Sequence, residues 1–447
     1  MAAIDPSRSF DQSSATLEST PLNRQTAIVL LSTLLFSAIA GCSQNEPDAS
    51  EGAFMIIMLP DTQNAVDFMQ QRAAGFAIDS SEIYLEQMRY IAGRGVTNGG
   101  NVVFVASVGD VWQHVSSDND PAHDARGVSA LIDVEAGFQR FVNHEGAVSF
   151  EIPKAVEGYQ LISDAGIPFG VPPGNHDYDA WWAVALPGER RDPQRPQSHV
   201  GGLNNFRTAF GSDTAFFRDK DWYVSGFEGG GSSAQVFDAG GYRFLHLAFE
   251  MHAGDDVIAW ARGVIDDYAG LPTIISTHDY LNSRGERLPG PSMDLALVDP
   301  EHNNSAEEIW RDFISQTDQI FMVLSGHQPG QALRIDTNDF GREVYQILAD
   351  FQLRGQAGLD AGEALGQGIG DGWHREMTFH LQDENPRVGV RTYSTHYDAY
   401  ASDLGTYADW YKSREQPEMT NEQFVSADEY TINLKDWRAR FGAPVLQ

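Results

Sequence analysis

Five short apolar runs, each ending in an aspartate, an asparagine or a histidine, constrain the fold of this chain more than any other feature. The runs are FMIIMLP, VVFVASVG, IPFGVPPG, PTIIST and IFMVLSG, and they lead into Asp61, Asp110, Asn175-His176-Asp177, Thr277-His278 and His327. Runs of this length that are rich in Val, Ile and Phe predict buried β-strands. Helical patterns at 80–92 and 255–267 alternate with them, so the sequence predicts an α/β fold.

The residues that follow these runs are suited to bind metal ions. In α/β folds, sites gather beyond the carboxyl ends of the strands. Carboxylates, amide oxygens and imidazoles are the ligands that hold divalent cations such as Mn, Fe and Zn. Two such ions about 3.5–4 Å apart can hold a phosphate ester together with the hydroxide that attacks it. Such a centre needs oxygen ligands, imidazoles and one bridging carboxylate, and this chain offers residues of these types at its predicted strand ends.

The order of these residues resembles the calcineurin-like metallophosphoesterase family. The family pattern is D-x-H, G-D, G-N-H-D/E, a lone His and then G-H-x-H, and the resemblance covers about residues 54–393. The segments MLPDTQ, LSGHQPG, YQILADFQ and GDGWHREMTF resemble a bacterial branch with Gln at the third position of the first motif. The resemblance implies two β-sheets packed as a sandwich and flanked by helices, with two divalent metal ions at one edge.

The resemblance also implies which residues would hold the two ions. Asp110 would bridge both ions, and Asn175, His278 and His327 would complete the second site. Asp61 would belong to the first site. Mn, Fe and Zn all suit such a ligand set.

The same resemblance assigns two residues next to the ions. His176 would contact the phosphate and protonate the leaving oxygen, and Asp177 would orient neighbouring groups. The implied activity is hydrolysis of a phosphate mono- or diester by metal-bound hydroxide. The implied partner is a phosphate ester, either a small molecule or a polymer.

Two departures from the family pattern concern the first metal site. Gln63 stands where the family has a histidine and would ligate the first ion through its amide oxygen, which is a weaker ligand than an imidazole. Pro329 stands where the family has the second histidine of its last motif, and proline offers no side-chain ligand. We expect the first ion to bind weakly, or to borrow a ligand from His114, Asp350 or Gln352.

These departures keep an alternative open. The chain would then be a one-metal or non-catalytic envelope lipoprotein that binds ligands in a degenerate cleft. A further departure, Gln113, occupies the position at which protein phosphatases of the family have an aspartate that holds the catalytic histidine. Its presence argues against a protein phosphatase.

Other residues that could carry chemistry are interpreted as structural. Trp181 and Trp182 predict either core packing or the wall of a substrate cleft, and the segment 187–202, with its Arg, Pro and Gln, predicts a loop. We expect His246 and His252 to be structural. A surface or core position is expected for His123, His144, His199, His302, His374, His380 and His396.

The N-terminal region predicts export and lipid anchoring. An apolar run at 27–40 ends in Ile39-Ala40-Gly41-Cys42, which resembles a bacterial lipobox around the only cysteine of the chain. The predicted organisation is a signal peptide at 1–41, a tether at 42–52, the metallophosphoesterase domain at 53–399 and a C-terminal extension at 400–447. Because serine follows Cys42, we expect a lipid-anchored protein on the periplasmic face of the outer membrane.

The charge and the cysteine count exclude several classes of function. The chain has 63 acidic and 30 basic residues and a formal net charge of −33, which argues against a nucleic-acid footprint. For the same reason we expect membrane contact only through the N-terminal lipid. A single cysteine excludes an intramolecular disulfide framework and a cysteine-rich zinc site.

Overall fold

Two large mixed β-sheets form the fold in the computed structural model, which describes residues 52–131, 139–184, 197–290, 292–364 and 368–445. Within these residues each large sheet has seven strands. The first sheet contains β1 (Phe54–Leu59), β2 (Val102–Ser107), β3 (Phe169–Gly170), β13 (Trp373–His380), β14 (Arg387–Ser394), β15 (Ala399–Tyr400) and β16 (Tyr430–Asn433). The second contains β6 (Tyr223–Phe227), β7 (Ser232–Ala239), β8 (Tyr242–Ala248), β9 (Thr273–Ser276), β10 (Ile320–Ser325), β11 (Gly330–Thr337) and β12 (Glu343–Asp350).

The central strands of both sheets are parallel. In the first sheet β1 pairs with β2 and β2 with β3, and in the second β8, β9, β10 and β12 pair in that order. Strands β13 to β16 of the first sheet and β6, β7 and β11 of the second pair antiparallel with their neighbours, and a separate ribbon joins β4 (Ala180–Val184) to β5 (Gln197–Gly201). Because the parallel strands point the same way, the residues that follow them meet at one edge of each sheet.

Residues from both sheets build the core between them. Every residue of β1 is buried, and alternate side chains of a strand point to opposite faces. Phe54, Ile56 and Met58 face the second sheet and share a cluster with Phe244 and Met322, while the intervening residues of β1 face the other way. This explains why β1 is apolar throughout: it is covered on both sides.

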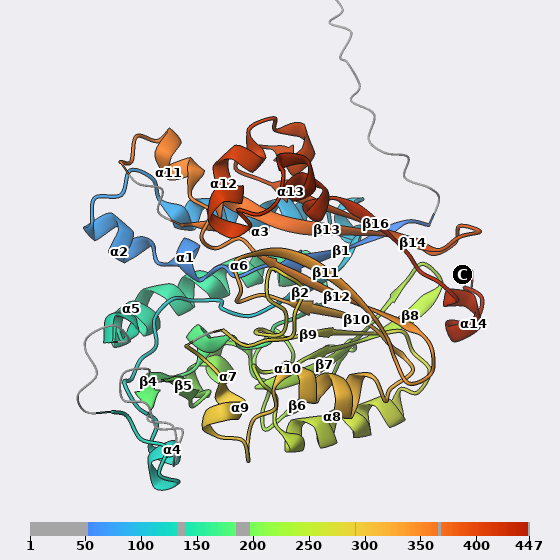
Figure 1. Ribbon diagram of the computed structural model, residues 1–447, viewed down its shortest axis with the longest axis horizontal. Coiled ribbons are helices and arrows are strands. Elements are labelled where there is room, and N and C mark those ends of the chain that lie inside the picture. Colours follow the sequence, from blue (N-terminus) through green and yellow to red (C-terminus); the bar gives the residue numbers. More distant parts are fainter. Residues whose placement is uncertain (1–51, 132–138, 185–196, 291, 365–367, 446–447) are drawn as a thin grey trace, which may run out of the picture. The chain divides into compact units, whose positions relative to one another are not determined.

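Helices cover the outer faces of the sheets (Figure 1). The helices are α1 (Gln63–Val66), α2 (Phe68–Ala73), α3 (Ser80–Gly93), α4 (Pro121–Ala125), α5 (His144–Gly146), α6 (Ile152–Asp164), α7 (Asn204–Phe210), α8 (Asp255–Asp267), α9 (Leu295–Val298), α10 (Ala306–Ile309), α11 (Gln356–Asp360), α12 (Tyr407–Glu415), α13 (Asn421–Asp428) and α14 (Trp437–Phe441). Helices α3 and α6 pack on the first sheet, and α8 and α10 pack on the second. The expected sandwich of two sheets flanked by helices is therefore confirmed.

The helix predictions are confirmed, and one loop prediction is partly wrong. Helix α8 has the predicted bounds, and α3 extends one residue further, with the Asp79 side chain accepting a hydrogen bond from the Ser81 amide at its start. Residues 197–201, expected in a loop, form β5 instead. Their backbone pairs with β4 in register from Gln197 to Gly201, a tertiary contact that local composition does not reveal.

The described part of the predicted C-terminal extension packs against the sheets. Strand β16 pairs with β14, and Tyr407, Phe424 and Trp437 are buried in the core between the sheets. Arg354 bonds both oxygens of Glu415 at 2.9 Å with its side chain fully buried, which ties α12 to the loop after β12. Residues 400–445 are thus continuous with the fold that precedes them.

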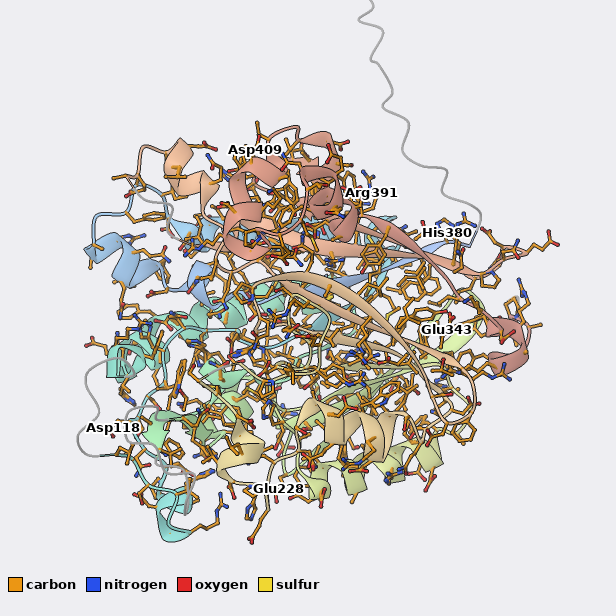
Figure 2. The ribbon with its side chains drawn as sticks, viewed as in Figure 1. Asp118, Glu228, Glu343, His380, Arg391 and Asp409 are labelled. Carbon is orange, nitrogen blue, oxygen red and sulfur yellow. The ribbon has the colours of Figure 1, made fainter. Side chains whose placement is uncertain are left out.

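Asp118, Glu228 and Asp409 are exposed at the periphery, in keeping with the acidic excess (Figure 2). In the described ranges, no helix combines the length and the apolar character that crossing a bilayer requires. The predicted signal peptide at 1–41 and the lipidation site Cys42 lie outside the described residues, so export and anchoring stay predictions.

Candidate metal centre

The five strand ends singled out in the sequence converge at one edge of the sandwich. Asp61 follows β1, Asp110 follows β2, and the single 3₁₀ turn Asn175–Asp177 follows β3. His278 and His327 follow the neighbouring strands β9 and β10 of the other sheet. One potential ligand atom from each of Asp110, His278 and His327 lies within 4.8 Å of the others.

His278 is at the middle of this cluster. Its Nδ1 donates a hydrogen bond to the Val108 carbonyl oxygen at 2.8 Å, which turns Nε2 toward the other side chains. That Nε2 lies 3.2 Å from Asp110 Oδ1, 3.0 Å from Asn175 Oδ1 and 3.1 Å from His327 Nδ1. A hydrogen bond from the far ring nitrogen to a carbonyl is the arrangement that orients metal-ligating histidines.

The spacing of these atoms fits ligands around one cation. Ligands about 2.0–2.2 Å from a common ion lie roughly 3.0–3.5 Å from one another. The donors of Asp110, Asn175, His278 and His327 are two oxygens and two nitrogens, a set that accepts Mn, Fe or Zn. The cluster is therefore compatible with a divalent metal ion, although whether each residue is a ligand stays a prediction.

The backbone of the loops that carry the cluster has left-handed residues and closely packed glycines. Asp110 and His327 both have left-handed backbone angles, with φ of 54° and 67°, which costs a non-glycine residue about 1–3 kcal/mol. A Cβ on Gly326 would lie 2.0 Å from Asp61 Oδ1, and a Cβ on Gly174 would lie 2.2 Å from Asp110 Oδ1. The glycines of the G-H and G-N-H-D motifs thus let two carboxylates approach the backbone.

Asp61 and Gln63 lie beside the shared carboxylate Asp110. Asp61 Oδ2 accepts a hydrogen bond from the His327 amide at 3.1 Å, while its Oδ1 is buried and has no hydrogen-bond partner among the described residues. Gln63 Nε2 donates to Asp110 Oδ2 at 2.9 Å and to Gln352 Oε1 at 2.5 Å. The Gln63 Oε1 is likewise buried without a partner in the described ranges, and an amide oxygen in that state can ligate a cation.

The carboxylates of this edge repel one another. Burial raises the pKa of Asp61 well above its usual value, and the neighbouring carboxylates of Asp350 and Asp110 raise it further. Burial also raises the pKa of Asp350 to about 6. Burial alone would lower the pKa of His278, but Asp110 and Asp61 raise it to about 10. A divalent cation would relieve the repulsion between the carboxylates and displace that proton.

His176 lies next to the cluster rather than inside it. Its backbone amide donates to Asp110 Oδ1 at 2.9 Å, and its Nδ1 donates to the Gln113 carbonyl oxygen at 2.5 Å. The Nε2 is 4.0 Å from Asp110 Oδ2, and the ring meets the Trp181 ring edge-on at a centroid distance of 4.7 Å. Trp181 is buried in the core cluster on the first sheet, so core packing, one of the two roles predicted for it, is confirmed, and its ring also contacts His176.

Asp177 holds two loops of the centre together. Its Oδ1 accepts a hydrogen bond from the Val111 amide at 2.8 Å, and its Oδ2 accepts one from the Gly174 amide at 2.8 Å. Burial raises the pKa of Asp177 to about 8, with the charge of Asp110 as the next cause. With both oxygens on backbone amides, Asp177 positions the loops that carry Asp110 and Asn175.

The structure adds residues that the sequence did not single out. Asp279, directly after His278, accepts a hydrogen bond from Gln328 Nε2 at 3.0 Å and lies 4.0 Å from His327 Nε2. Glu151 accepts from the amides of Gln113 and His114 at 3.0 and 2.9 Å and so supports the carbonyl that bonds His176. Asp279 could have been found by its place beside a predicted ligand, whereas no local signal marks Glu151.

The three proposed donors for the first site have different positions. Asp350 ends β12 and accepts hydrogen bonds from the amide and the Nε2 of Gln352 at 3.0 and 3.2 Å. Gln352 in turn contacts Gln63. His114 instead places Nδ1 2.6 Å from Glu151 Oε1 and Nε2 3.0 Å from Gln70 Nε2, so both of its ring nitrogens are engaged elsewhere.

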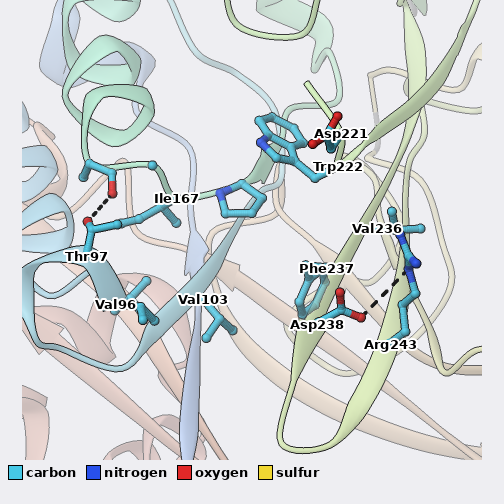
Figure 3. Close-up of a pocket in the computed structure, with 14 residues that line it drawn as sticks. Val96, Thr97, Val103, Ile167, Asp221, Trp222, Val236, Phe237, Asp238 and Arg243 are labelled. Atoms are coloured by element: carbon cyan, nitrogen blue, oxygen red, sulfur yellow. Dashed lines mark hydrogen bonds and ion pairs between the residues drawn. The ribbon is translucent and has the colours of Figure 1, made fainter. Parts of the chain in front are cut away.

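A surface pocket lies at the other end of the parallel strands (Figure 3). It has a volume of about 370 Å³ and touches the first residues of β2 and the segment that leads into β3. Its charged residues include Asp238 and Arg243, which form an ion pair at 3.9 Å, and no histidine lines it. Because the candidate ligands follow the opposite ends of these strands, this pocket is separate from the metal centre.

Comparisons with known proteins give distant similarities. No family sequence profile matches the chain. The uncharacterized protein YvnB of Bacillus subtilis (strain 168) is 26% identical over 254 residues, which cover 55% of this chain but only 16% of that protein. A crystal structure of a dimetal phosphatase from Danio rerio covers 77% of this chain and 97% of its own, with 12% identity and a TM-score of 0.34. Neither similarity assigns an activity to this chain.

Proposed function

We propose that this chain is a metal-dependent phosphoric ester hydrolase with its centre at the strand-end cluster. The observation that carries the proposal is the convergence of Asp110, His278, His327 and Asn175, with donor atoms 3.0–3.2 Å from His278 Nε2. Divalent ions held there would supply Lewis-acid chemistry and an activated nucleophile for attack on phosphorus. The order of the motifs along the chain supports the same reaction class.

His176 is the residue that would move a proton. Since Nδ1 donates to the Gln113 carbonyl, Nε2 is the nitrogen left to face a bound ester. Burial lowers the pKa of His176, but the negative charge of a phosphate would favour the doubly protonated ring. The ring would then donate its Nε2 proton to the leaving oxygen. Glu151 and Gln113 hold the ring in that orientation.

A second candidate, the binding of a single ion without turnover, has one observation in its favour. Gln63 donates its amide hydrogens to Asp110 Oδ2 and Gln352 Oε1. The hydrogen bond to Asp110 engages the carboxylate oxygen that a first-site ion would need as a ligand. Rotation of the Gln63 amide by about 180° would exchange its oxygen and nitrogen and turn the oxygen toward a first-site ion. The number of ions bound per chain distinguishes the two candidates.

The test of the proposed function is hydrolysis after removal and return of metal. The purified chain is stripped with a chelator and then supplied with Mn²⁺, Zn²⁺, Fe²⁺ or Mg²⁺. Release of p-nitrophenol is followed from bis(p-nitrophenyl) phosphate and from p-nitrophenyl phosphate. We expect activity to disappear on chelation and to return with at least one metal. Two bound ions per active chain would favour the hydrolase over the one-ion candidate.

The matched control is Asp110→Asn, which keeps the size of the side chain but removes the shared charge. It should bind less metal and stay inactive through the same cycle. A folded wild-type chain that hydrolyses neither ester with any of these metals would contradict the proposal. Equal activity in the Asp110→Asn variant would contradict the assignment of the site.

Asp350 should strengthen the first metal site, which lacks both family imidazoles. The Asp350→Asn substitution removes a carboxylate beside Asp61 and should weaken the first ion by about 10- to 100-fold. Isothermal titration of the stripped chain with Mn²⁺ measures the change. Asp339→Asn is the control, because Asp339 is exposed and distant from the cluster in the β11–β12 turn. Unchanged affinity in Asp350→Asn would show that the first site does not use this carboxylate.

A further inference from the structure

Three histidines and one aspartate, far apart in the sequence, meet beside the β4–β5 ribbon. His123 lies in α4, His199 lies in β5, and Asp299 and His302 follow α9. One potential ligand atom from each of His123, His199 and Asp299 lies within 4.8 Å of the other two. His199 Nε2 is 4.0 Å from Asp299 Oδ2. From the sequence the three histidines are expected at ordinary surface or core positions, and nothing in the sequence singles out Asp299.

The Nδ1 atoms of His123 and His199 are both engaged by neighbouring groups. His123 Nδ1 is 2.5 Å from Asp120 Oδ2, so the carboxylate fixes the ring and leaves Nε2 available. This carboxylate–imidazole pairing is common behind metal-ligating histidines. In His199, Nδ1 lies 2.7 Å from the carbonyl oxygen and 2.8 Å from the amide nitrogen of Val200, so either tautomer is satisfied at Nδ1.

His199 Nε2 is a buried polar atom without a hydrogen-bond partner among the described residues. The residue is 1% exposed, and its Nε2 makes no hydrogen bond with any residue that the structure describes. A buried polar group without a partner costs about 1–3 kcal/mol, so a ligand for this nitrogen would stabilise the fold. By contrast, both ring nitrogens of His114, in the cluster with Asp67 and Glu151, already have partners. The unpartnered nitrogen therefore favours the cluster around His199 as a binding site.

Neighbouring residues shape this site closely. The Trp182 ring stacks on His199 at a centroid distance of 5.2 Å and meets the edge of His123 at 5.2 Å. A Cβ on Gly201 would lie 2.6 Å from His123 Nδ1, so only glycine admits the ring there. Burial, and then the neighbouring His123, lower the pKa of His199 to about 4, which keeps the ring in the neutral form that can bind metal.

One cation already contacts the aspartate. Arg126 Nη1 lies 2.7 Å from Asp299 Oδ2 and 2.7 Å from His302 Nδ1, and that His302 nitrogen is 3.0 Å from Asp299 Oδ1. Because a guanidinium only donates, His302 Nδ1 accepts from Arg126 and does not also donate to Asp299. A carboxylate has about four lone-pair directions, so Asp299 can accept from Arg126 and still offer an oxygen to an ion. The positive charge of Arg126 lowers the affinity for a cation, which favours an ion that binds imidazole strongly over Mg²⁺ or Ca²⁺.

We propose that His123, His199 and Asp299 bind a first-row divalent metal ion such as Zn²⁺, whose fourth position is left to a small ligand such as water. Two imidazoles and one carboxylate are a known protein ligand set for zinc. The ion would fasten α4 and the turn after α9 to the β4–β5 ribbon. That ribbon also carries Trp181, which contacts His176. The proposal is independent of the proposed hydrolytic function, because it involves other residues and is tested by the zinc content of the chain, not by ester hydrolysis.

The test counts zinc in a chain whose strand-end cluster has been disabled. In the His278→Ala/His327→Ala background, equilibrium dialysis against Zn²⁺ and elemental analysis should give one ion per chain. Adding His123→Ala and His199→Ala should remove that ion. The control adds His144→Ala and His396→Ala instead, which removes two exposed imidazoles and should leave the ion in place. A background chain that binds no zinc, or equal zinc in all three proteins, would overturn the proposal.

A second measurement covers the case in which the multiple variants do not fold. In the otherwise intact chain, His199→Gln should lower the zinc content by one ion per chain relative to wild type. Trp182→Phe, which changes a stacked ring but no ligand, should keep the wild-type content. Because Ni²⁺ quenches nearby indoles, part of the Ni²⁺-induced fluorescence loss should vanish in Trp182→Phe. Unchanged zinc in His199→Gln would overturn the proposal without affecting the hydrolase.

Discussion

Replacing His278 with alanine should empty the strand-end cluster of its second-site ion and lower phosphate ester hydrolysis by at least about 10³-fold. His278 Nε2 lies within 3.2 Å of donor atoms from Asp110, Asn175 and His327, so its imidazole contacts all three. A lost ligand removes transition-state charge stabilisation worth several kcal/mol, and each 1.36 kcal/mol is a factor of ten in rate.

Two measurements check this result, namely metal content by elemental analysis and turnover of bis(p-nitrophenyl) phosphate at saturating Mn²⁺. The His327→Ala variant should behave in the same way, because Nδ1 of His327 lies 3.1 Å from His278 Nε2 in the same cluster. His396→Ala is the matched control, since that imidazole is exposed and belongs to none of the candidate metal clusters of the described residues. Full activity in a folded His278→Ala variant would show that His278 is not part of the metal centre.

Replacing His176 with alanine should separate catalysis from metal binding. The ring lies next to Asp110 but its Nε2 is 4.0 Å from the nearest carboxylate oxygen, so the metal content should stay at the wild-type value. Loss of a general acid lowers the rate by about 10²–10⁴-fold. The rate loss should be smaller for an ester with a p-nitrophenolate leaving group than for one with an alkoxide, because the alkoxide needs the proton more.

The His176→Ala variant is checked by its metal content and by its turnover of two esters, one with a p-nitrophenolate and one with an alkoxide leaving group. The backbone amide of residue 176 still donates to Asp110, so the substitution should leave the loop in place. Glu151→Gln is a companion variant: it weakens the support of Gln113 without touching the metal cluster and should lower the rate less than His176→Ala. If His176→Ala also lost the metal, the division between ligand and proton donor would be wrong.

The chain positions of the site could be predicted from sequence because strand ends are a local signal. Apolar runs define buried strands, and parallel strands place their following residues at one edge. Asp350 belongs to the same pattern, since YQILA is a further apolar run that ends in a carboxylate. From the sequence, Asp350 is one of three alternative donors to the first metal site. The sequence does not favour it over the other two, because it does not show that β12 lies parallel to β10.

Other features depend on contacts that no local pattern encodes. His123, His199 and Asp299 come from a short helix, a ribbon and a turn, so neither helical nor strand periodicity relates them. Gln63 was predicted as a metal ligand, yet its Nε2 donates to Asp110 and its oxygen has no partner in the described ranges. Such orientations are set by hydrogen-bond geometry in the folded state, which composition and spacing do not contain.

Anomalous X-ray scattering from crystals grown with Mn²⁺ tests the central claim most directly. Data collected at the manganese absorption edge locate each ion without reference to activity. We expect one peak within ligand distance of Asp110, Asn175, His278 and His327, and a weaker peak beside Asp61 and Asp350. Strong diffraction with no manganese peak at the ends of β1, β2, β9 and β10 would contradict the assignment of this edge as a metal centre.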